Sequence, residues 1–357
     1  MKEIQAISYQ EWANFVAHHP FGSPFQHPDF YKLWNHKRSG ASVVFFHWDE
    51  DNKIDGLVLA YPCSYFPENR WWPKALVALN GPLTRPALPE KKQIEITQAL
   101  ISQLSREKGW SVPLIELRNM KNIPWINTKI DDSCLNLCKE ISDEESLINT
   151  ASRRQKRNLR KINTENFWVA EPESEEEVNA LIRLLQRHYR RIRKPCIPGS
   201  LLKAIVATGA KQESFRVLVT KKEGKICGGS VIALDKKTCY EWYIISDRSV
   251  KNSGVATTYG AMRYALKEGC YYFDFMGIGR PGIPYGVRDF KMGFGGEVQE
   301  YRRYRLRDLA KTKNPDIKRY QGSDKIGGDL LSRFHSTIGA SGLNFSVRNG
   351  KRWTPLQ

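Results

Sequence analysis

The order of strand-like and helix-like segments constrains this chain most, because one order occurs twice. In the first occurrence, residues 41–48 and 54–61 have the composition of β-strands and are separated by an acidic turn. Residues 95–108 carry apolar side chains at helical spacing, and residues 113–118 have strand character again. This pattern predicts an antiparallel hairpin followed by a helix and a further strand.

The second half of the chain repeats this pattern. We expect a short strand at 167–170 and a long helix at 175–193, which Ser174 and Glu177 begin as a capping box. We then expect strands at 215–220, 226–234 and 239–245, a helix at 257–267, and strands at 271–276 and 297–306. Two α/β units in tandem, with mixed and mostly antiparallel sheets, are therefore predicted.

The 357 residues are enough for two domains. We expect an N-terminal domain at 1–145, a C-terminal domain at 146–310, and a polar C-terminal extension at 311–357 that contains clusters of Gly and Ser.

Positive charge is concentrated in the second half. The net charge is +18, yet residues 1–150 contain 16 basic against 18 acidic residues, which leaves 40 basic against 20 acidic residues in 151–357. This asymmetry favours a polyanionic partner, which could be nucleic acid, a phosphorylated substrate or an anionic membrane face. The alternative is a solvated basic surface that aids solubility.

Several classes of protein are disfavoured. The polar N-terminus lacks the apolar core of a signal peptide, and no apolar run approaches the ~20 residues that a membrane span needs. The seven scattered cysteines fit reduced thiols, so we expect a cytoplasmic protein. Cys134 and Cys138 have the spacing of a metal pair, but no second Cys or His pair follows, and we expect no metal site.

Two basic clusters are candidate phosphate-binding segments. Residues 153–161 hold six basic residues in nine positions, among them Arg154 and Arg157, and no acid. The end of the helix predicted at 175–193 is also basic and includes Arg193. Like charges on one helix repel each other, and an anionic partner would offset that repulsion. The alternative is a solvated face and, for the second cluster, a favourable interaction with the helix C-terminus.

A glycine-bearing turn at 251–256 precedes the helix predicted at 257–267. Such a turn presents free backbone N–H groups to a phosphate, so Lys251 and Gly254 are candidate phosphate ligands. A Gly before a helix is common, and the signal is weak by itself.

The most specific segment follows the strand at 271–276. Gly277 and Gly279 come directly after the strand, and residues 285–296 are rich in glycine. Glycines at this density indicate tight turns and close approach of the backbone to a ligand, with Tyr285 and Phe290 as contacts. Lys291 lies among them and suits a phosphate or a developing oxyanion. The alternative is a bulged glycine-rich hairpin with Lys291 at its rim.

Three carboxylates are candidates for a general base. Glu241 lies in the middle of a predicted strand, Asp274 alternates with two phenylalanines, and Asp289 lies between Arg288 and Lys291. We include Glu241, Asp274 and Lys291 as candidate catalytic residues.

The strings GCYYFDFMGIG and YGVRDFKMGFGG, within 269–296, resemble the closing signature of the FemABX family. This family is the non-ribosomal peptidyltransferase branch of the GNAT superfamily. Asn80–Leu83 resembles the Gly-Pro motif of its first domain, residues 24–28 with Trp34 resemble its N-terminal Gln…Trp motif, and Ser152–Lys161 resembles its basic segment. The resemblance spans about residues 20–305 and is specific only from about 268 to 296.

The resemblance implies two tandem GNAT-like domains and an activity that transfers an aminoacyl group from aminoacyl-tRNA to an amine of a peptidoglycan or glycan precursor. The family's motif lysine corresponds to Lys291. Aminoacyl-tRNA or acyl-CoA would be a co-substrate, and the protein would have no permanently bound cofactor. The protein would also contact the inner membrane face peripherally. The turn at 251–256 resembles the CoA loop of GNAT acyltransferases. This second resemblance keeps open the alternative that the chain is an acyl-CoA-dependent N-acyltransferase in polysaccharide or lipid modification. A third alternative, from another class of function, is a non-catalytic RNA-binding or adaptor protein.

Overall fold

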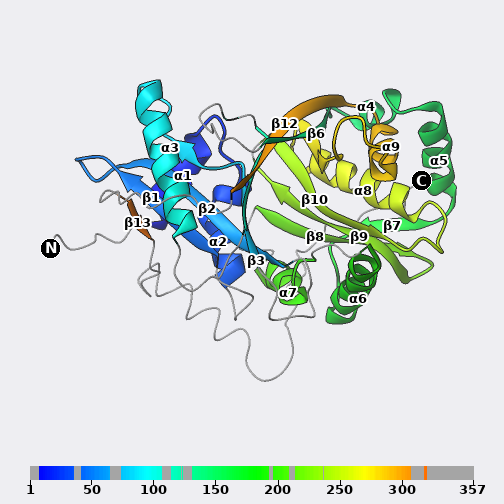
Figure 1. Cartoon of the computed structure of the whole chain (residues 1–357). Helices are drawn as coiled ribbons and strands as arrows, with labels where there is room; N and C mark the ends of the chain where they lie inside the picture. Colours follow the sequence, from blue (N-terminus) through cyan, green and yellow to red (C-terminus); the bar gives the residue numbers. More distant parts are fainter. Residues whose placement is uncertain are drawn as a thin grey trace, which may run out of the picture. The chain divides into compact units, whose positions relative to one another are not determined.

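The chain folds into two compact units (Figure 1). The computed structural model describes residues 8–35, 42–64, 74–106, 114–121, 123, 131–192, 196–208, 214–235, 237–306 and 317–319. The first unit contains the described residues up to Asp132 and from Arg302 on, and the second contains those from Ser133 to Tyr301.

These limits differ from the predicted ranges 1–145 and 146–310. Strand β6 (Asp131–Glu140) pairs with β11 (Tyr272–Gly277), which assigns Ser133 onward to the second unit. From Arg302 on, β12 (Glu297–Leu306) pairs with β5 (Leu114–Asn119) of the first unit. The predicted extension at 311–357 lies outside the described residues except for 317–319, which form β13 (Ile317–Arg319) and pair with β1 (Val43–Trp48).

The first unit is built on a mixed sheet with the strand order β13-β1-β2-β3-β5-β12. Only β3 and β5 run parallel within this order. Its other elements are β2 (Ile54–Ser64), β3 (Lys74–Leu79), β4 (Leu83–Thr84), α1 (Tyr9–His18), η1 (Pro24–Gln26), α2 (Pro28–Asn35) and α3 (Glu90–Ser105).

Alternating side chains of β1 cover both faces of this sheet. Phe45 joins the apolar core that includes Ile96 and Leu100 of α3. The next residue, Phe46, contacts the Trp12 ring of α1 on the other face, with ring centroids 5.1 Å apart. The alternation expected of a strand with both faces buried is therefore present.

Gln26 connects the N-terminal segment to this sheet. Its Nε2 donates to the carbonyls of Leu59 (3.1 Å) and Leu79 (2.8 Å), and its Oε1 accepts from Leu59 N (2.9 Å). A Cβ at Gly81 would lie 2.7 Å from the Gln26 side chain, so only glycine fits there. The Gln and Gly-Pro motifs thus meet in one structural contact of the first unit.

The second unit has the strand order β6-β11-β10-β9-β8-β7, in which only β10 and β11 are parallel. Its remaining strands are β7 (Phe167–Ala170), β8 (Phe215–Lys222), β9 (Lys225–Leu234) and β10 (Thr238–Ser246). Its helices are α4 (Glu144–Asn149), α5 (Arg153–Thr164), α6 (Glu175–Ile192), α7 (Gly199–Thr208), α8 (Ser253–Lys267) and α9 (Gly286–Met292).

Two adjacent glycines of β9 show which helices cover which face of this sheet. A Cβ at Gly228 would lie 2.5 Å from Thr257 Oγ1 of α8, whereas a Cβ at Gly229 would lie 2.7 Å from the Leu181 side chain of α6. Because successive residues of a strand face opposite sides, α8 packs on one face and α6 on the other. Because α8 and α6 each approach the backbone of β9 closely, both positions need a glycine.

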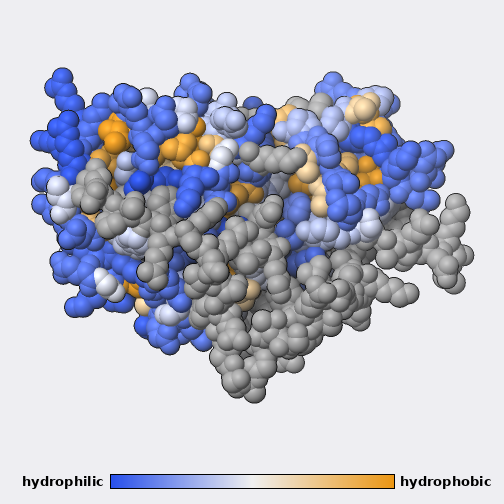
Figure 2. All heavy atoms as spheres, turned by 180° about the vertical axis from the view of Figure 1, so that it is seen from behind, coloured by the Kyte–Doolittle hydropathy of each residue, from blue (hydrophilic) through white to orange (hydrophobic). Residues whose placement is uncertain are grey.

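The two units share one topology: antiparallel strands, a helix, and a strand parallel to the one before that helix. In the first unit this sequence is β1, β2, β3, α3 and β5, and in the second it is β8, β9, β10, α8 and β11. The predicted fold class, a mixed α/β arrangement of two similar units with mostly antiparallel sheets, is confirmed. The described residues on the face shown in Figure 2 are mostly hydrophilic, with hydrophobic residues in a few smaller areas.

Candidate active site

The candidate site lies in the second unit, where β10 and β11 part. These parallel strands pair only from Thr238 to Tyr240 of β10 and from Tyr272 to Asp274 of β11. Beyond these pairs β10 continues beside β9, with a register shift between Glu241 and Tyr243. Charged side chains gather directly after the last paired residues.

Lys291 is buried at this point, with 5% of its surface exposed. Its Nζ donates a short hydrogen bond to the carbonyl oxygen of Phe275 in β11. Burial lowers the pKa of Lys291, and the carboxylates of Glu241 and Asp274 oppose that shift. The glycine-rich segment was expected as a turn, but Lys291 lies on the short helix α9 and points inward. Residues 286–292 are helical because their glycine is at the first position, where it does not interrupt the helix.

Glu241 is the second buried charge of the site, with 1% of its surface exposed. One carboxylate oxygen accepts from Thr258 Oγ1 of α8 at 3.1 Å. The other, Oε2, has no hydrogen-bond partner within the described part of the chain. Burial raises the pKa of Glu241 to about 7, against smaller opposing effects of Lys291 and Thr258. A carboxyl with a pKa near neutrality and a free oxygen is suited to accept a proton.

Asp274 holds the backbone of β11 in shape. Its carboxylate accepts from Asn136 Nδ2 (3.0 Å) and from the backbone N of Met276 (2.6 Å). Met276 has a φ of 60°, a conformation that a non-glycine residue adopts rarely, and the register of β11 against β6 shifts between Asp274 and Gly277. The contacts of Asp274 thus suit a positioning residue.

Tight turns follow, as the glycines indicated. Gly279 has a φ of 92°, and a Cβ there would lie 2.9 Å from the Tyr285 ring. A Cβ at Gly277 would lie 3.0 Å from the Tyr301 hydroxyl. Arg288 holds the loop between them and α9, because its guanidinium donates to the carbonyls of Ile278, Arg280 and Ile283. The loop that Arg288 holds ends at Tyr285, which is the N-cap residue of α9.

The turn at 251–256 adjoins the site. Helix α8 begins at Ser253, four residues before the predicted start, so Gly254 lies in its first turn. The site of a Cβ at Gly254 is 3.1 Å from Ser246 Oγ and 3.7 Å from the Phe290 ring of α9. Lys251 is exposed directly before this helix. Backbone N–H groups at a helix N-terminus attract anions, and phosphate binding at this turn, next to α9, stays a prediction.

The structure does not bring the basic residues of the sequence prediction to Lys291. Arg154 and Arg157 are exposed on α5 and make no hydrogen bond or ion pair with the buried cluster. Arg193 lies outside the described residues. Helix α5 is separate from α4, and Ser152 caps it by accepting from Gln155 N at 3.2 Å.

Lys139 and Thr258 are residues of this region that sequence reasoning missed. Lys139 is buried on β6 and donates to Thr150 Oγ1 and to the carbonyl of Phe294 at 2.8 Å. Burial and the nearby Lys156 lower the pKa of Lys139 to about 8. It thereby connects the end of the glycine-rich segment to the C-terminal end of α4. A lysine within an alternating run of apolar residues was the signal for it.

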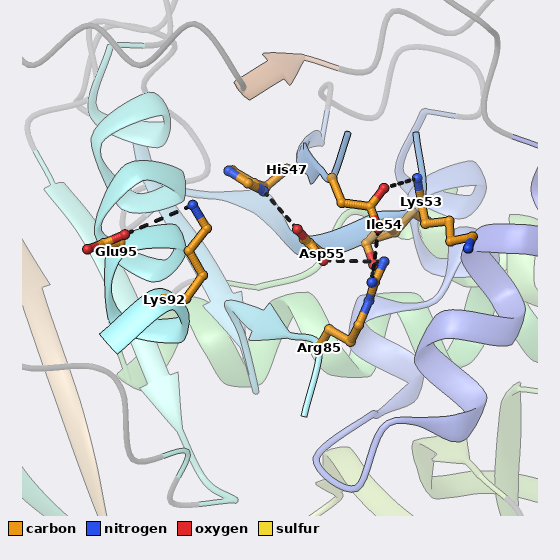
Figure 3. Close-up of polar contacts among 8 residues, drawn as sticks. His47, Lys53, Ile54, Asp55, Arg85, Lys92 and Glu95 are labelled. Atoms are coloured by element: carbon orange, nitrogen blue, oxygen red, sulfur yellow. Dashed lines mark hydrogen bonds and ion pairs between the residues drawn. The ribbon is translucent and has the colours of Figure 1, made fainter. Parts of the chain in front are cut away.

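The first unit contains two charge clusters that hold its fold. Asp55 lies between Arg85 (3.3 Å) and His47 (3.8 Å), and Arg85 also pairs with Asp49 at 3.0 Å (Figure 3). Asp49 in turn accepts from Lys53 N at 2.7 Å and closes the turn between β1 and β2. The charges compensate one another, which favours a structural role.

The second cluster surrounds Glu116 of β5, whose side chain is fully buried. Its carboxylate pairs with Arg118 (2.5 Å), Arg305 (3.5 Å) and Arg303 (3.7 Å). These guanidinium groups outweigh the effect of burial and lower the pKa of Glu116 to about 2. Three cations around one carboxylate stabilise its ionised form.

None of the seven cysteines, all of which lie in the described part of the chain, forms a disulfide bond. Among the described residues, no group of three or more His, Cys, Asp or Glu side chains is arranged to hold a metal ion. In the same part of the chain, no helix has the length and apolar character that crossing a membrane requires.

Comparison with known proteins places this site in a known type of domain. Residues 149–292 match the acetyltransferase (GNAT) domain family. This range includes α5, α8, α9, Glu241 and Lys291, and it confirms the predicted resemblance to the GNAT superfamily over the second unit. No curated protein matches the sequence.

Solved structures share the fold over most of the chain. A crystal structure of FemX matches with a TM-score of 0.59 and 14% identity, covering 84% of this chain and 96% of FemX. A tandem GNAT protein from the clavulanic acid biosynthesis pathway matches with a TM-score of 0.53 and 9% identity, covering 85% and 96%. A conserved protein of unknown function from Bacteroides thetaiotaomicron VPI-5482 matches with a TM-score of 0.50 and 11% identity, covering 85% and 99%. At these identities the matches establish the fold.

Proposed function

We propose that this chain is an acyltransferase that moves an aminoacyl or acyl group onto an amine of a cell-wall peptidoglycan or glycan precursor. One observation carries the proposal: Lys291 and Glu241 are buried together where β10 and β11 part, inside the segment that matches the GNAT domain. A buried cation beside a carboxyl with a pKa of about 7 is an arrangement that supports transfer to an amine.

The reaction needs a proton acceptor for the incoming ammonium group. Glu241 takes one proton from it, and the neutral nitrogen attacks the carbonyl carbon of the donor. This attack gives a tetrahedral intermediate, which collapses as the bond from that carbon to oxygen in an aminoacyl ester, or to sulfur in a thioester, breaks. The second nitrogen proton goes to the leaving oxygen or sulfur, and Glu241 returns its proton to solvent. We assign the base role to Glu241 because the hydrogen bonds of Asp274 with Asn136 and with the Met276 amide suit a positioning residue.

Lys291 supplies positive charge near the reacting carbonyl. The tetrahedral intermediate carries an oxyanion, and a fixed cation in a buried site stabilises it much more than it would in water. The first turn of α8, with Gly254 and the exposed Lys251, would hold a phosphate of the donor. Both aminoacyl-tRNA and acyl-CoA carry such phosphates.

The resemblance of residues 268–296 to the FemABX signature supports aminoacyl-tRNA as the donor. The glycine turn at the start of α8 favours the second candidate, an acyl-CoA-dependent N-acyltransferase of polysaccharide or lipid modification. A non-catalytic RNA-binding protein would need the basic α5 but would not need Lys291 and Glu241 buried together.

Thermal-shift titration separates these functions. We expect charged tRNA to raise the melting temperature of the wild type and acetyl-CoA to leave it unchanged. The acyl-CoA function is correct instead if only acetyl-CoA stabilises the chain. A Lys291→Ala variant that still binds tRNA and complements a deletion strain like the wild type would refute the enzymatic proposal.

A further inference from the structure

Helix α5 presents a basic surface that the described chain does not neutralise. Its apolar residues Leu159 and Ile162 are buried, and no Asp or Glu occurs between residues 153 and 164. The exposed basic side chains are those of Arg153, Arg154, Arg157, Arg160 and Lys161. None of these five side chains makes an ion pair or hydrogen bond with a described residue. The helix therefore carries an uncompensated positive field toward solvent.

Exposed aliphatic side chains occur on helix α9 and on the loop before it. Ile283 is 52% exposed, Val287 39% and Met292 46%. The carbonyl of Ile283 accepts from Arg288 Nη1 at 3.1 Å, so this side chain projects from an ordered loop. Single exposed apolar residues are ordinary, but these three lie within ten residues of one another in the chain, and we call them the aliphatic group.

The basic helix and the aliphatic group adjoin each other. The backbone N of Ser152, the N-cap of α5, donates to the carbonyl of Gly293 at 2.9 Å. Gly293 follows Met292 directly, and a Cβ at Gly293 would lie 3.6 Å from Gln155 Oε1 of α5. Figure 1 shows α5 and α9 side by side. The end of α9 therefore meets the start of α5, and the two features form one surface.

We propose that this surface, formed by the basic residues of α5 with Ile283, Val287 and Met292, docks the second unit on an anionic lipid membrane. Peripheral proteins bind such membranes by combining basic side chains at the headgroups with aliphatic side chains at the acyl boundary. The phosphates of an RNA would contact the basic side chains alone, whereas the exposed aliphatic side chains suit the acyl boundary of a membrane. Stacking of unpaired bases would also need exposed aromatic rings beside the basic helix. The exposed Tyr271 and Tyr272 lie at the start of β11, at the other end of that strand from Gly277.

Docking through α9 has a consequence for the site. Lys291, on the same short helix, is buried, whereas Val287 and Met292 face outward. Membrane contact would hold the candidate site within a helix diameter of the headgroups. This consequence rests on the proposed function and indicates a lipid-linked amine acceptor, whereas membrane binding itself does not depend on the reaction.

Vesicle co-sedimentation of the full chain tests the proposal. We expect the wild type to pellet with vesicles of phosphatidylglycerol and phosphatidylcholine and to stay in solution with phosphatidylcholine alone. The double variant R154E/R157E should bind at least ~25-fold more weakly, because each arginine near an anionic surface contributes about fivefold. The matched control R183E/R187E makes the same charge change on α6, which packs on the other face of the sheet, and should bind like the wild type.

A second pair tests the aliphatic contribution without a change of charge. V287S/M292Q should weaken vesicle binding several-fold while keeping the melting temperature and the transfer rate to a water-soluble amine acceptor. The proposal is overturned if the wild type does not pellet with anionic vesicles, or if both control and test variants bind them equally. It is also overturned if R154E/R157E loses tRNA binding and keeps vesicle binding, because the surface then belongs to RNA. If vesicles bind as expected but no amine is acylated, only the proposed function fails.

Discussion

Replacement of Glu241 by Gln should make the protein more stable at alkaline pH. In the folded chain the pKa of Glu241 is about 7, against 4.5 for an exposed glutamate. A folded pKa above the unfolded one means that the fold prefers the protonated carboxyl. Its stabilisation is complete below pH ~4.5 and is lost as the pH rises through about 7.

The size of this effect follows from the pKa difference. One pKa unit corresponds to about 1.4 kcal/mol, so ionisation of Glu241 costs the fold about 3 kcal/mol above pH 8. Glutamine has the shape of the protonated acid and does not ionise. The difference in unfolding free energy between Glu241→Gln and the wild type should therefore be near zero at pH 4.5 and about 3 kcal/mol at pH 8.5, in favour of the variant.

Urea denaturation at a series of pH values measures this difference. The variant Glu140→Gln, at an exposed position of β6, is the matched control for the chemical change. A difference that does not change with pH would refute the reasoning, because it would mean that Glu241 titrates normally in the folded chain.

Three further predictions concern other residues. Lys291→Met should lower the transfer rate ~100-fold or more and leave the donor-induced thermal shift intact, because the lost charge acts on the transition state; a normal rate would contradict this role. Gly279→Ala should destabilise the chain by about 1–3 kcal/mol, because its φ is 92° and its Cβ would lie 2.9 Å from Tyr285. Gly286→Ala, which meets no atom within 4 Å, should not, and equal effects in denaturation would refute the strain argument. Glu116→Gln should lower the unfolding free energy by about 3 kcal/mol at pH 7, because the folded pKa near 2 stabilises the fold above pH ~4.5. This cost should disappear in acid denaturation as the pH falls toward 2, and a cost that persists there would count against the arginine pairs.

Most strands were predictable because both faces of the two sheets are buried, but β3, β4, β6 and β13 were not predicted. The β-branched runs at 215–220 and 226–234 correspond to β8 and β9, each somewhat longer than expected. The start of α8 was placed too late, because Ser253 and Gly254 have the composition of a loop, while the first turn of a helix tolerates both. Helix α9 was missed because glycines on both sides of it concealed a seven-residue helix.

The electrostatic interaction of Lys291 with Glu241 could not be predicted from the sequence. The two residues are 50 positions apart, and the charge of each affects the other because β10 and β11 run parallel and part after Asp274. Long-range strand pairing of this kind leaves no local signal. For Asp274, the sequence showed a charged residue between two phenylalanines. It did not show that the carboxylate accepts hydrogen bonds from Asn136 and the Met276 amide.

The pH dependence of transfer to an amine acceptor tests the central claim most directly. With saturating donor, log kcat/KM of the wild type should rise with pH and level off above an apparent pKa of about 7, as Glu241 becomes ionised. Glu241→Gln should be slower by two orders of magnitude or more and should lack this limb. An unchanged limb at about 7 in Glu241→Gln would show that another group takes the proton and would contradict the account.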